Sequence, residues 1–502
     1  MRFRFTQQNN LDAMPISEVI ISETSRHELC PLLAGLQYVF TTAEVNEKVY
    51  QILETKIMSN KKVTGRLGMS LWEILVLGSV RLNLNIDYDM LQDLANNHKT
   101  LRGILGVETK LVFGKEHKYH LTTIKENVGL LDDSTLKEIS TEIVKAGHNL
   151  LKKNEKTTQK EEKIVLKIKT DSFPVAANVH FPTDLNLLWD GIQKSLSCLT
   201  IIKKTEDVKG WRKIDYKKSK LKSVYRKASE IHRKKGANYK ERLEEAVTDY
   251  AKRSMELSSR LNKTIELLDI VIKEDSKSFS ILSNLKYFLT LMDKHIDLLA
   301  RRILKEEKIP HDEKLFSLFE QHVEWLTKGK LHGGVVLGHN VAITTDQFSF
   351  IIDHHVMVKE VDKQLAISII ERVLEMYSEG CYFESISFDR GFYSLCAKEA
   401  LSKKIEKVIM PKPGSKSAKV EAEEAEENYV KLRKKHSAIE SNINELRHSG
   451  ADFVPDKGLD GFKDYIAMSV LAHNLKRLGT IIIAQKVEKK SSTKRVRQAS
   501  AA

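Results

Sequence analysis

Apolar positions change their spacing several times along the chain, and each change predicts a different kind of element. From about residue 35 to residue 155, apolar residues recur every three or four positions, as in SLWEILVLGSVRLNLN and STLKEISTEIVKAGHNLLKK. This spacing places the apolar side chains on one face of an α-helix. We therefore expect an all-helical N-terminal domain over residues 1–160.

One stretch of this region has a pattern found in DNA-binding proteins. In MLQDLANNHKTLRGILGV, two short amphipathic segments are joined by a polar Asn-Asn-His turn. A helix-turn-helix has this form, and so does an ordinary helical hairpin. The pattern leaves both alternatives open, and in our leading interpretation residues 1–160 bind DNA.

The spacing changes to two at KIVLKIKTDSF. Ile164, Leu166 and Ile168 alternate with lysines, which predicts a strand that ends at Asp171. We expect residues 161–190 to form the first part of a β-containing domain.

The helical spacing returns after this strand. It runs from Leu185 to about Glu320 and includes long heptad-like stretches such as ERLEEAVTDYAKRSMELSSRLNKTIELLDIVIKE. We expect residues 191–327 to form an all-helical insertion.

Strands and helices alternate in the remainder of the chain. GGVVLGHNVAITTD and QFSFIIDHHVMV predict a hairpin, followed by a helix, the strand ESISFD, a second helix and the strand KVIMPKP. After a polar, flexible loop at residues 411–428 come the helices SAIESNINELRH and YIAMSVLAHNLKRLG. Residues 328–480 then complete the β-containing domain, and residues 481–502 form a basic, disordered tail.

The order of these elements predicts the fold class. Without the insertion it is β-β-β-α-β-α-β-α, which is the connectivity of an RNase H-like fold. The sequence therefore predicts an α/β protein with an RNase H-like mixed sheet, a large all-helical insertion within it, and an all-α domain before it.

Composition limits the classes of protein that fit. Of the 502 residues, 41% are hydrophobic and 30% are charged, and no apolar run approaches a membrane span. The four cysteines are scattered without a C-x-x-C pair, which indicates reduced thiols and a cytoplasmic protein. The net charge of +14 favours a polyanionic partner, although a lysine-rich proteome would produce the same surplus.

Three acidic residues fall at positions that can converge. Asp171 and Asp389 end the first and fourth predicted strands, which lie side by side in an RNase H-like sheet, and Glu440 lies on a later helix. Carboxylates are the ligands that Mg²⁺ and Mn²⁺ prefer, and two such ions promote phosphoryl transfer. The three residues therefore predict a metal-dependent active site.

The phase of the later helix favours Glu440 over Glu445. Glu440 shares a polar stripe with Arg447, where a cation could hold a DNA phosphate beside the metals, whereas Glu445 points away from it. The packing stripe consists of Ile439, Ile443 and Leu446.

Several segments resemble insertion-sequence transposases of the DDE class, close to the ISNCY type. These segments are SFDRGFYS, HSAIESNINELRHSGADFVPDKG, VLAHNLKRLG and, around the first aspartate, TDSFPVAANVHFPTDLNLLWD. The resemblance covers roughly residues 163–190 and 328–479. It implies that Asp171, Asp389 and Glu440 are the catalytic, metal-binding residues, with two Mg²⁺ or Mn²⁺ ions per site.

The resemblance also implies the substrate and its phosphate contacts. Arg447, Arg390 and Arg433 are the candidates for binding DNA phosphates. Arg447 stands seven positions after the glutamate, where relatives often have Lys, and Arg433 shares the stretch before the glutamate with Lys434, Lys435 and His436. Which of these four plays the role of the basic residue found there in relatives stays open.

The implied function is a DNA transposase in the cytoplasm of a prokaryote, associated with the nucleoid. It would cut at transposon ends and join the freed 3′-hydroxyl to target DNA, acting as a homodimer or higher multimer on double-stranded DNA, with no membrane partner. The alternatives are an RNase H-like nuclease without strand transfer and an inactive or domesticated DNA-binding protein. Under a purely structural interpretation, Asp171 caps a turn, Asp389 pairs with Arg390, and Glu440 is solvated.

Other features have weaker functional interpretations. The loop residues Asn178, His180 and Asp184 either orient the site or form their own hydrogen-bond network. Between Lys203 and Lys240, fifteen Lys or Arg stand against four Asp or Glu, which fits either a phosphate-binding arm or a solvated helix face. For the remaining candidates we favour structural roles: Asp353, His354 and His355 in a strand, and Trp189 and Trp211 in a core.

Overall fold

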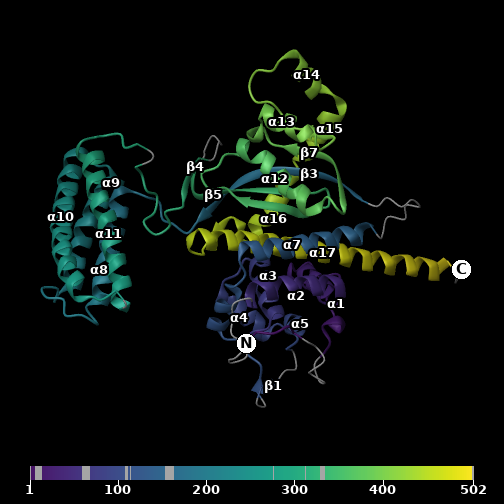
Figure 1. Cartoon of the computed structure of the whole chain (residues 1–502), viewed down its shortest axis with the longest axis horizontal. Coiled ribbons are helices and arrows are strands. Elements are labelled where there is room, and N and C mark those ends of the chain that lie inside the picture. The colour runs from purple at the N-terminus through teal and green to yellow at the C-terminus, as the bar shows by residue number, and fades with distance from the viewer. Residues whose placement is uncertain are drawn as a thin grey trace. The chain divides into compact units, whose positions relative to one another are not determined.

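The computed structural model of the chain describes residues 2–5, 14–58, 68–107, 111–112, 115–152, 163–274, 276–310, 313–327 and 334–499. The chain is a mixed α/β protein with two compact units (Figure 1). The first unit combines Met1–Asn178 with Glu324–Ala502, and the second is Val179–Val323.

A mixed sheet forms the centre of the first unit. Its seven strands in the described part of the chain are β3 (Ile164–Ala177), β4 (Glu324–Thr327), β5 (Val335–Thr345), β6 (Ile351–Val356), β7 (Cys381–Phe388), β8 (Lys407–Ile409) and β9 (Phe453–Val454). β3 is central, with β5 antiparallel on one side and β7 parallel on the other. β8 continues the sheet beyond β7, whereas β4 and β6 both pair with β5. The predicted β5–β6 hairpin is confirmed.

β3 extends further than the sequence pattern predicts. We expected it to end at Asp171, but it continues to Ala177, with Phe173 and Val175 buried. The alternation of apolar residues resumes beyond the aspartate, and β5 and β9 supply the backbone partners. Asp171 therefore lies within a strand that is paired on both sides.

Helices follow β6 and β7, as the pattern predicts. They are α12 (Asp362–Tyr377) and, after the short helix η4 (Arg390–Phe392), α13 (Leu395–Ser402). The expected flexible loop at residues 411–428 contains instead the helix α14 (Ala418–Ala425), where buried Glu424 accepts hydrogen bonds from Lys416 and from the Lys412 backbone. α15 (Glu427–His436), α16 (Ile439–Leu446) and the π-helical turn η5 (Arg447–Ala451) follow.

The N-terminal helices belong to the same compact unit as the sheet. They are η2 (Ile16–Glu18), α1 (Leu29–Thr41), α2 (Ala43–Met58), α3 (Leu71–Asn83), α4 (Tyr88–Asn97), α5 (Lys99–Ile104), α6 (Leu121–Val128) and α7 (Asp133–Lys152), with the small strands β1 (Leu111–Val112) and β2 (Lys115–Glu116). α1, α3 and α7 pack on the long helix α17 (Gly458–Ala499), and Figure 1 shows α7 and α17 passing below the sheet in that view. The predicted boundary at residue 160 therefore does not separate two compact units.

The candidate helix-turn-helix is formed by α4 and α5. His98 separates the two helices, and its Nδ1 accepts a hydrogen bond from the Leu101 backbone. Four of the six residues of α5 are buried. A recognition helix needs an exposed face to enter a DNA groove, so the structure favours the helical-hairpin alternative.

α17 differs from the predicted C-terminal region. Its helix continues to Ala499, whereas residues 481–502 were expected to be a disordered tail. Lys, Arg, Gln and Ala are good helix formers, so they extend a helix that begins in the core. By length and composition, Gly458–Ser491 could also cross a membrane, but most of its apolar window is buried inside the unit, as in the core helix of a soluble protein.

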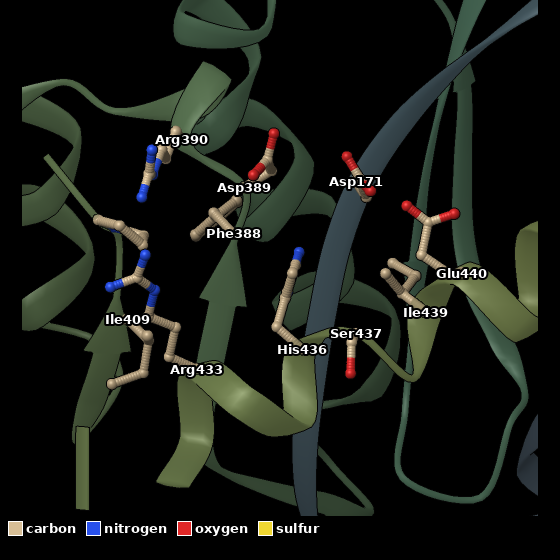
Figure 2. Close-up of a pocket in the computed structure, with 11 residues that line it drawn as sticks. Asp171, Phe388, Asp389, Arg390, Ile409, Arg433, His436, Ser437, Ile439 and Glu440 are labelled. Carbon is tan, nitrogen blue, oxygen red and sulfur yellow. The ribbon is translucent and has the colours of Figure 1, made fainter. Parts of the chain in front are cut away.

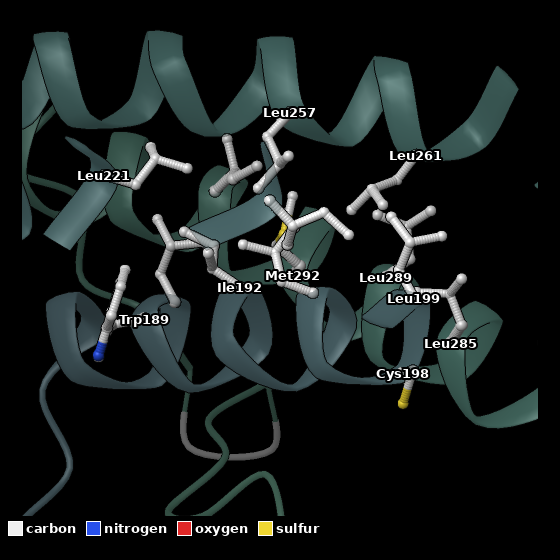
Figure 3. Close-up of a cluster of buried hydrophobic side chains, with 14 of the residues drawn as sticks. Trp189, Ile192, Cys198, Leu199, Leu221, Leu257, Leu261, Leu285, Leu289 and Met292 are labelled. Atoms are coloured by element: carbon white, nitrogen blue, oxygen red, sulfur yellow. The ribbon is translucent and has the colours of Figure 1, made fainter. Parts of the chain in front are cut away.

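The second unit is a helical bundle, as predicted for the insertion. It contains α8 (Asp184–Ile202), α9 (Ile214–Lys234), α10 (Tyr239–Val271), α11 (Lys277–Leu299) and the π-helical turn η3 (Ala300–Leu304). Leucine and isoleucine side chains from these helices fill its core (Figure 3). The bundle begins earlier than the expected residue 191, because α8 contributes Leu185, Leu188 and Trp189 to that core.

A buried ion pair in the first unit predicts how its stability depends on pH. His148 Nε2 on α7 lies 2.7 Å from Asp346 Oδ2, and both side chains are buried. Burial alone would lower the pKa of His148, but hydrogen bonds to Asp346 and Cys381 outweigh it and raise that pKa to about 9. The pair therefore stabilises the fold fully below the pKa of an unfolded histidine, about 6.5, and this contribution is lost as pH rises through 9.

We expect the free energy of unfolding to fall by about 3 kcal/mol from this pair alone between pH 6 and pH 10. Denaturant titrations across that range measure it. The His148→Gln variant should be less stable at pH 6 and should lack this part of the pH dependence. An identical pH dependence in both proteins would show that His148 is not charged in the fold.

Candidate active site

The register of β3 and β7 brings two of the predicted catalytic residues together. The last registered pair of these parallel strands is Thr170 with Phe388, so Asp171 and Asp389 are the next residues on each. Neighbouring strands lie about 4.8 Å apart. The two aspartates therefore stand side by side at the carboxyl end of this pairing.

Glu440 joins them around one pocket. The cavity measures about 300 Å³ and is lined by residues from β3, β7, β8, α15 and α16 (Figure 2). Its lining residues are Asp171, Phe388, Asp389, Arg390, Ile409, Pro411, Arg433, His436, Ser437, Ile439 and Glu440. The three acids selected from the sequence thus face one space.

The predicted phase of α16 is confirmed. Its packing stripe, Ile439, Ile443 and Leu446, is buried, whereas Glu440 is exposed towards the pocket. Glu445 points elsewhere and lies 3.5 Å from His473 Nδ1 on α17. Of these two glutamates, the one that helix phase favoured lines the pocket.

Negative charge accumulates at Asp171. Burial of its carboxyl and the charges of Asp389, Glu440 and Asp362 together raise the pKa of Asp171 to about 7, against a hydrogen bond from the Ser172 backbone that lowers it. A carboxylate with so high a pKa lacks a cation to stabilise its charge. Bound cations would relieve this repulsion.

A fourth carboxylate, Asp362, was missed from the sequence. It is the first residue of α12, and the aspartate side chain lies against the backbone of Gly391, two residues after Asp389. Burial and the charge of Asp389 raise the pKa of Asp362, and its Oδ1 is buried without a hydrogen-bond partner in the described structure. An acid in the first turn of a helix is ordinary, so the sequence contains no signal for it.

His436, one of the four candidates for the basic residue before the glutamate, also lines the pocket. Its Nδ1 lies 3.0 Å from Ser387 Oγ on β7, and its Nε2 is buried with no partner among the described residues. Burial lowers the pKa of His436, while the nearby charge of Asp389 opposes that shift. The ring is therefore neutral at pH 7.

Two of the three predicted phosphate-binding arginines line the pocket. Arg390 forms no ion pair with Asp389 in the described structure, and Figure 2 shows the two side chains pointing apart. Arg433 lies 3.9 Å from Glu424. Of the four candidates before the glutamate, Arg433 and His436 line the cavity, whereas Lys434 and Lys435 do not.

Arg447 does not line this pocket. Its guanidinium lies over the ring of Phe173, 5.4 Å from the ring centroid, and its Nε is 3.8 Å from Asp452. The backbone N–H of Arg447 still bonds the Ile443 carbonyl as in an α-helix, so the helix phase is kept up to this residue and its side chain turns to Phe173 and Asp452. The structure therefore does not bring Arg447 into the pocket of the three acids.

The donor atoms fit divalent cations, although they are not yet gathered around one point. In the described part of the chain, no three His, Cys, Asp or Glu side chains lie at the spacing of a preformed metal site. Figure 2 shows Asp171 and Glu440 on one side of His436 and Asp389 on the other. Carboxylate oxygens suit Mg²⁺ and Mn²⁺, and side-chain rotation would be needed to bring them onto one ion.

The secondary candidates have other partners. In the second unit, His180 binds Asp190 at 2.7 Å and Asp184 binds Arg302 at 3.0 Å, while Asn178 is exposed at the end of the first segment of the other unit. These contacts fit the loop-network alternative. The strand residues contact three different elements, in the pairs Asp353–Arg372, His354–Asp133 and His355–Glu360.

Both tryptophans belong to the core of the bundle, as we favoured. Trp189 stacks on Tyr225 with ring centroids 5.3 Å apart. Trp211 is 1% exposed and donates a hydrogen bond from Nε1 to Thr264 Oγ1. Neither indole has a free face for a DNA base.

The pocket, and the segments of sequence around it, are the basis for a functional proposal. Comparisons of the chain with protein-family models, curated proteins and solved structures gave no match.

Proposed function

We propose that the protein is a DDE-class DNA transposase that cuts DNA at transposon ends and joins the freed 3′-hydroxyl to target DNA. The observation that carries the proposal is the pocket shared by Asp171, Asp389 and Glu440. These residues come from three separate parts of the chain, and sequence patterns alone predict each of them.

The sheet supports an RNase H-like core. From one edge the order is β6-β5-β3-β7-β8, with β5 antiparallel to β3, and β7 and β8 parallel to it. Helices follow β6 and β7. The five strands predicted from the sequence correspond to β3, β5, β6, β7 and β8. Their order in the sheet is the one expected of an RNase H-like fold.

Each part of the pocket has a role in this chemistry. Two Mg²⁺ or Mn²⁺ ions would supply activation of the attacking hydroxyl and stabilisation of the leaving oxygen. Asp171, Asp389 and Glu440 are the residues that would hold these ions. Arg390 and Arg433, on the opposite wall, bind phosphates of the strand and orient it.

The reaction has two displacements at phosphorus. Water first breaks a phosphodiester at the transposon end and leaves a 3′-hydroxyl. That hydroxyl then attacks a phosphodiester of the target, forming a new bond as the target's own 3′-oxygen leaves. A nuclease with the same pocket would stop after the first displacement.

The charge of α9 supports a DNA partner. The basic stretch from Lys203 to Lys240 contains this helix, and most of its Lys and Arg side chains are exposed. Lys222, Arg226 and Lys227 have no acidic partner in the described structure. Such side chains release counterions from DNA when they contact phosphates.

We propose that the protein acts on DNA as a homodimer or higher multimer, in the cytoplasm.

The decisive assay is Mg²⁺-dependent cleavage and joining of DNA that carries the element's own ends. We expect Asp171→Asn, Asp389→Asn and Glu440→Gln each to lower both rates by about 10³-fold or more, because each removes charge that positions the ions. End binding should persist. Glu445→Gln is the matched control on the same helix and should stay active.

The possible failures of this assay are distinct. Full activity of the Glu440→Gln variant would show that Glu440 is not a catalytic residue. Cleavage by the unaltered protein without any joining would identify a nuclease, and end binding without either reaction would identify a DNA-binding protein.

Metal binding should depend on pH through Asp171. Since its pKa is about 7 in the metal-free protein, binding of Mg²⁺ at pH 7 should release about half a proton from this residue. Calorimetry in buffers with different ionisation enthalpies measures that number. Release should approach zero by pH 9, and a value near zero already at pH 7 would contradict the raised pKa.

DNA affinity should depend on α9. Replacing Lys222, Arg226 and Lys227 with Gln should reduce the slope of log K against log salt by up to about 3, because each phosphate contact contributes about 0.9. Fluorescence anisotropy at several salt concentrations measures it. A control variant replaces Lys48, Lys56 and Lys145 with Gln. It loses the same charge, but these lysines pair with acids in the unaltered protein. Equal slopes for the two variants would exclude α9 from the interface.

A further inference from the structure

The His436 ring is held at one nitrogen and unpartnered at the other. Nδ1 lies 3.0 Å from Oγ of Ser387, a buried residue two positions before Asp389 on β7. Nε2 is also buried, yet it has no hydrogen-bond partner in the described structure. Buried polar atoms in proteins almost always have a hydrogen-bond partner or ligand. We therefore expect Nε2 to bind a group that enters the pocket.

The hydrogen bond of Nδ1 determines what Nε2 can do. The Ser387 hydroxyl can accept a hydrogen bond as well as donate one, so Nδ1–H can donate to its Oγ. In the neutral imidazole with the hydrogen on Nδ1, Nε2 carries the lone pair.

The direction of the ring places that lone pair in the pocket. His436 is a lining residue, and Figure 2 shows the nitrogen at the end of its ring between Asp389 and Asp171. A histidine that binds a metal through one nitrogen typically donates from the other to a carbonyl or carboxylate, which fixes the tautomer. A hydrogen bond from Nδ1 to Ser387 Oγ fixes the ring in the same way.

We propose that His436 Nε2 is a further metal ligand of this pocket, binding one of the divalent ions that the carboxylates hold. The inference rests on the proposed function, which requires those ions, but it adds a nitrogen donor to an all-oxygen set. Imidazole suits transition metals better than Mg²⁺. The site should therefore bind Mn²⁺ more tightly than Mg²⁺, by a margin that His436 provides.

Pulsed electron paramagnetic resonance of the full chain with Mn²⁺ tests this directly, since it detects nitrogen coupled to the ion. The unaltered protein should show ¹⁴N coupling, which should change to ¹⁵N coupling when only its histidines carry ¹⁵N. This labelling requires no substitution and so does not depend on a variant that folds.

Variants then identify the histidine. His436→Gln should lose the nitrogen coupling and bind Mn²⁺ about tenfold more weakly, with less effect on Mg²⁺. His448→Gln, an exposed histidine outside the pocket, is the matched control and should keep both properties.

The outcomes separate this inference from the proposed function. The unaltered protein could bind Mn²⁺ without nitrogen coupling, while Asp171→Asn and Glu440→Gln no longer bind it. That result would overturn the role of His436 and leave the carboxylate site intact. Coupling that survives in His436→Gln would assign the nitrogen to another residue and overturn it equally. Absence of Mn²⁺ binding in the unaltered protein would overturn both.

Discussion

The parallel pairing of β3 with β7 is the constraint on which the candidate site depends. Its register makes Asp171 and Asp389 neighbours, although 218 positions separate them in the sequence. β3 is also paired with β5 over eight residues, including Asp171 with Ile343, so it cannot slip on one side without breaking pairs on the other. The long helical insertion therefore leaves the geometry of the two aspartates unaffected, because it enters the chain after β3 is complete.

The same pairing concentrates charge that the fold does not neutralise. Asp171, Asp389, Asp362 and Glu440 influence one another, as the raised pKa of Asp171 records. Arg390 and Arg433 line the same cavity without pairing with these acids, and Arg433 is drawn instead towards Glu424. Such a cluster opposes folding and is retained where function requires it. Divalent cations between the acids, and phosphates against the arginines, would satisfy both sets of charges.

Sequence patterns predicted the parts of the site that follow from periodicity and chain order. Alternation located β3 and β7, and helix phase selected Glu440 over Glu445. Patterns could not reveal Asp362, because its position against Gly391 comes from packing between elements, and they left His436 as one of four candidates for a basic residue. Helix phase alone did not place Arg447, because its side chain turns to Phe173 and Asp452 and not to the pocket. Patterns also could not reveal that the N-terminal helices belong to the compact unit of the sheet, because the close packing of α1 on α17, at Gly35 and Gly479, leaves no periodic signal.

The central claim is that Asp171, Asp389 and Glu440 together bind divalent metal ions. Anomalous diffraction from crystals grown with Mn²⁺ tests it most directly, because the signal locates the ions without reference to activity. The account predicts anomalous peaks within ligand distance of these three carboxylates, after the side chains have rotated towards one another. Ordered Mn²⁺ elsewhere in the molecule, with none in this pocket, would contradict it.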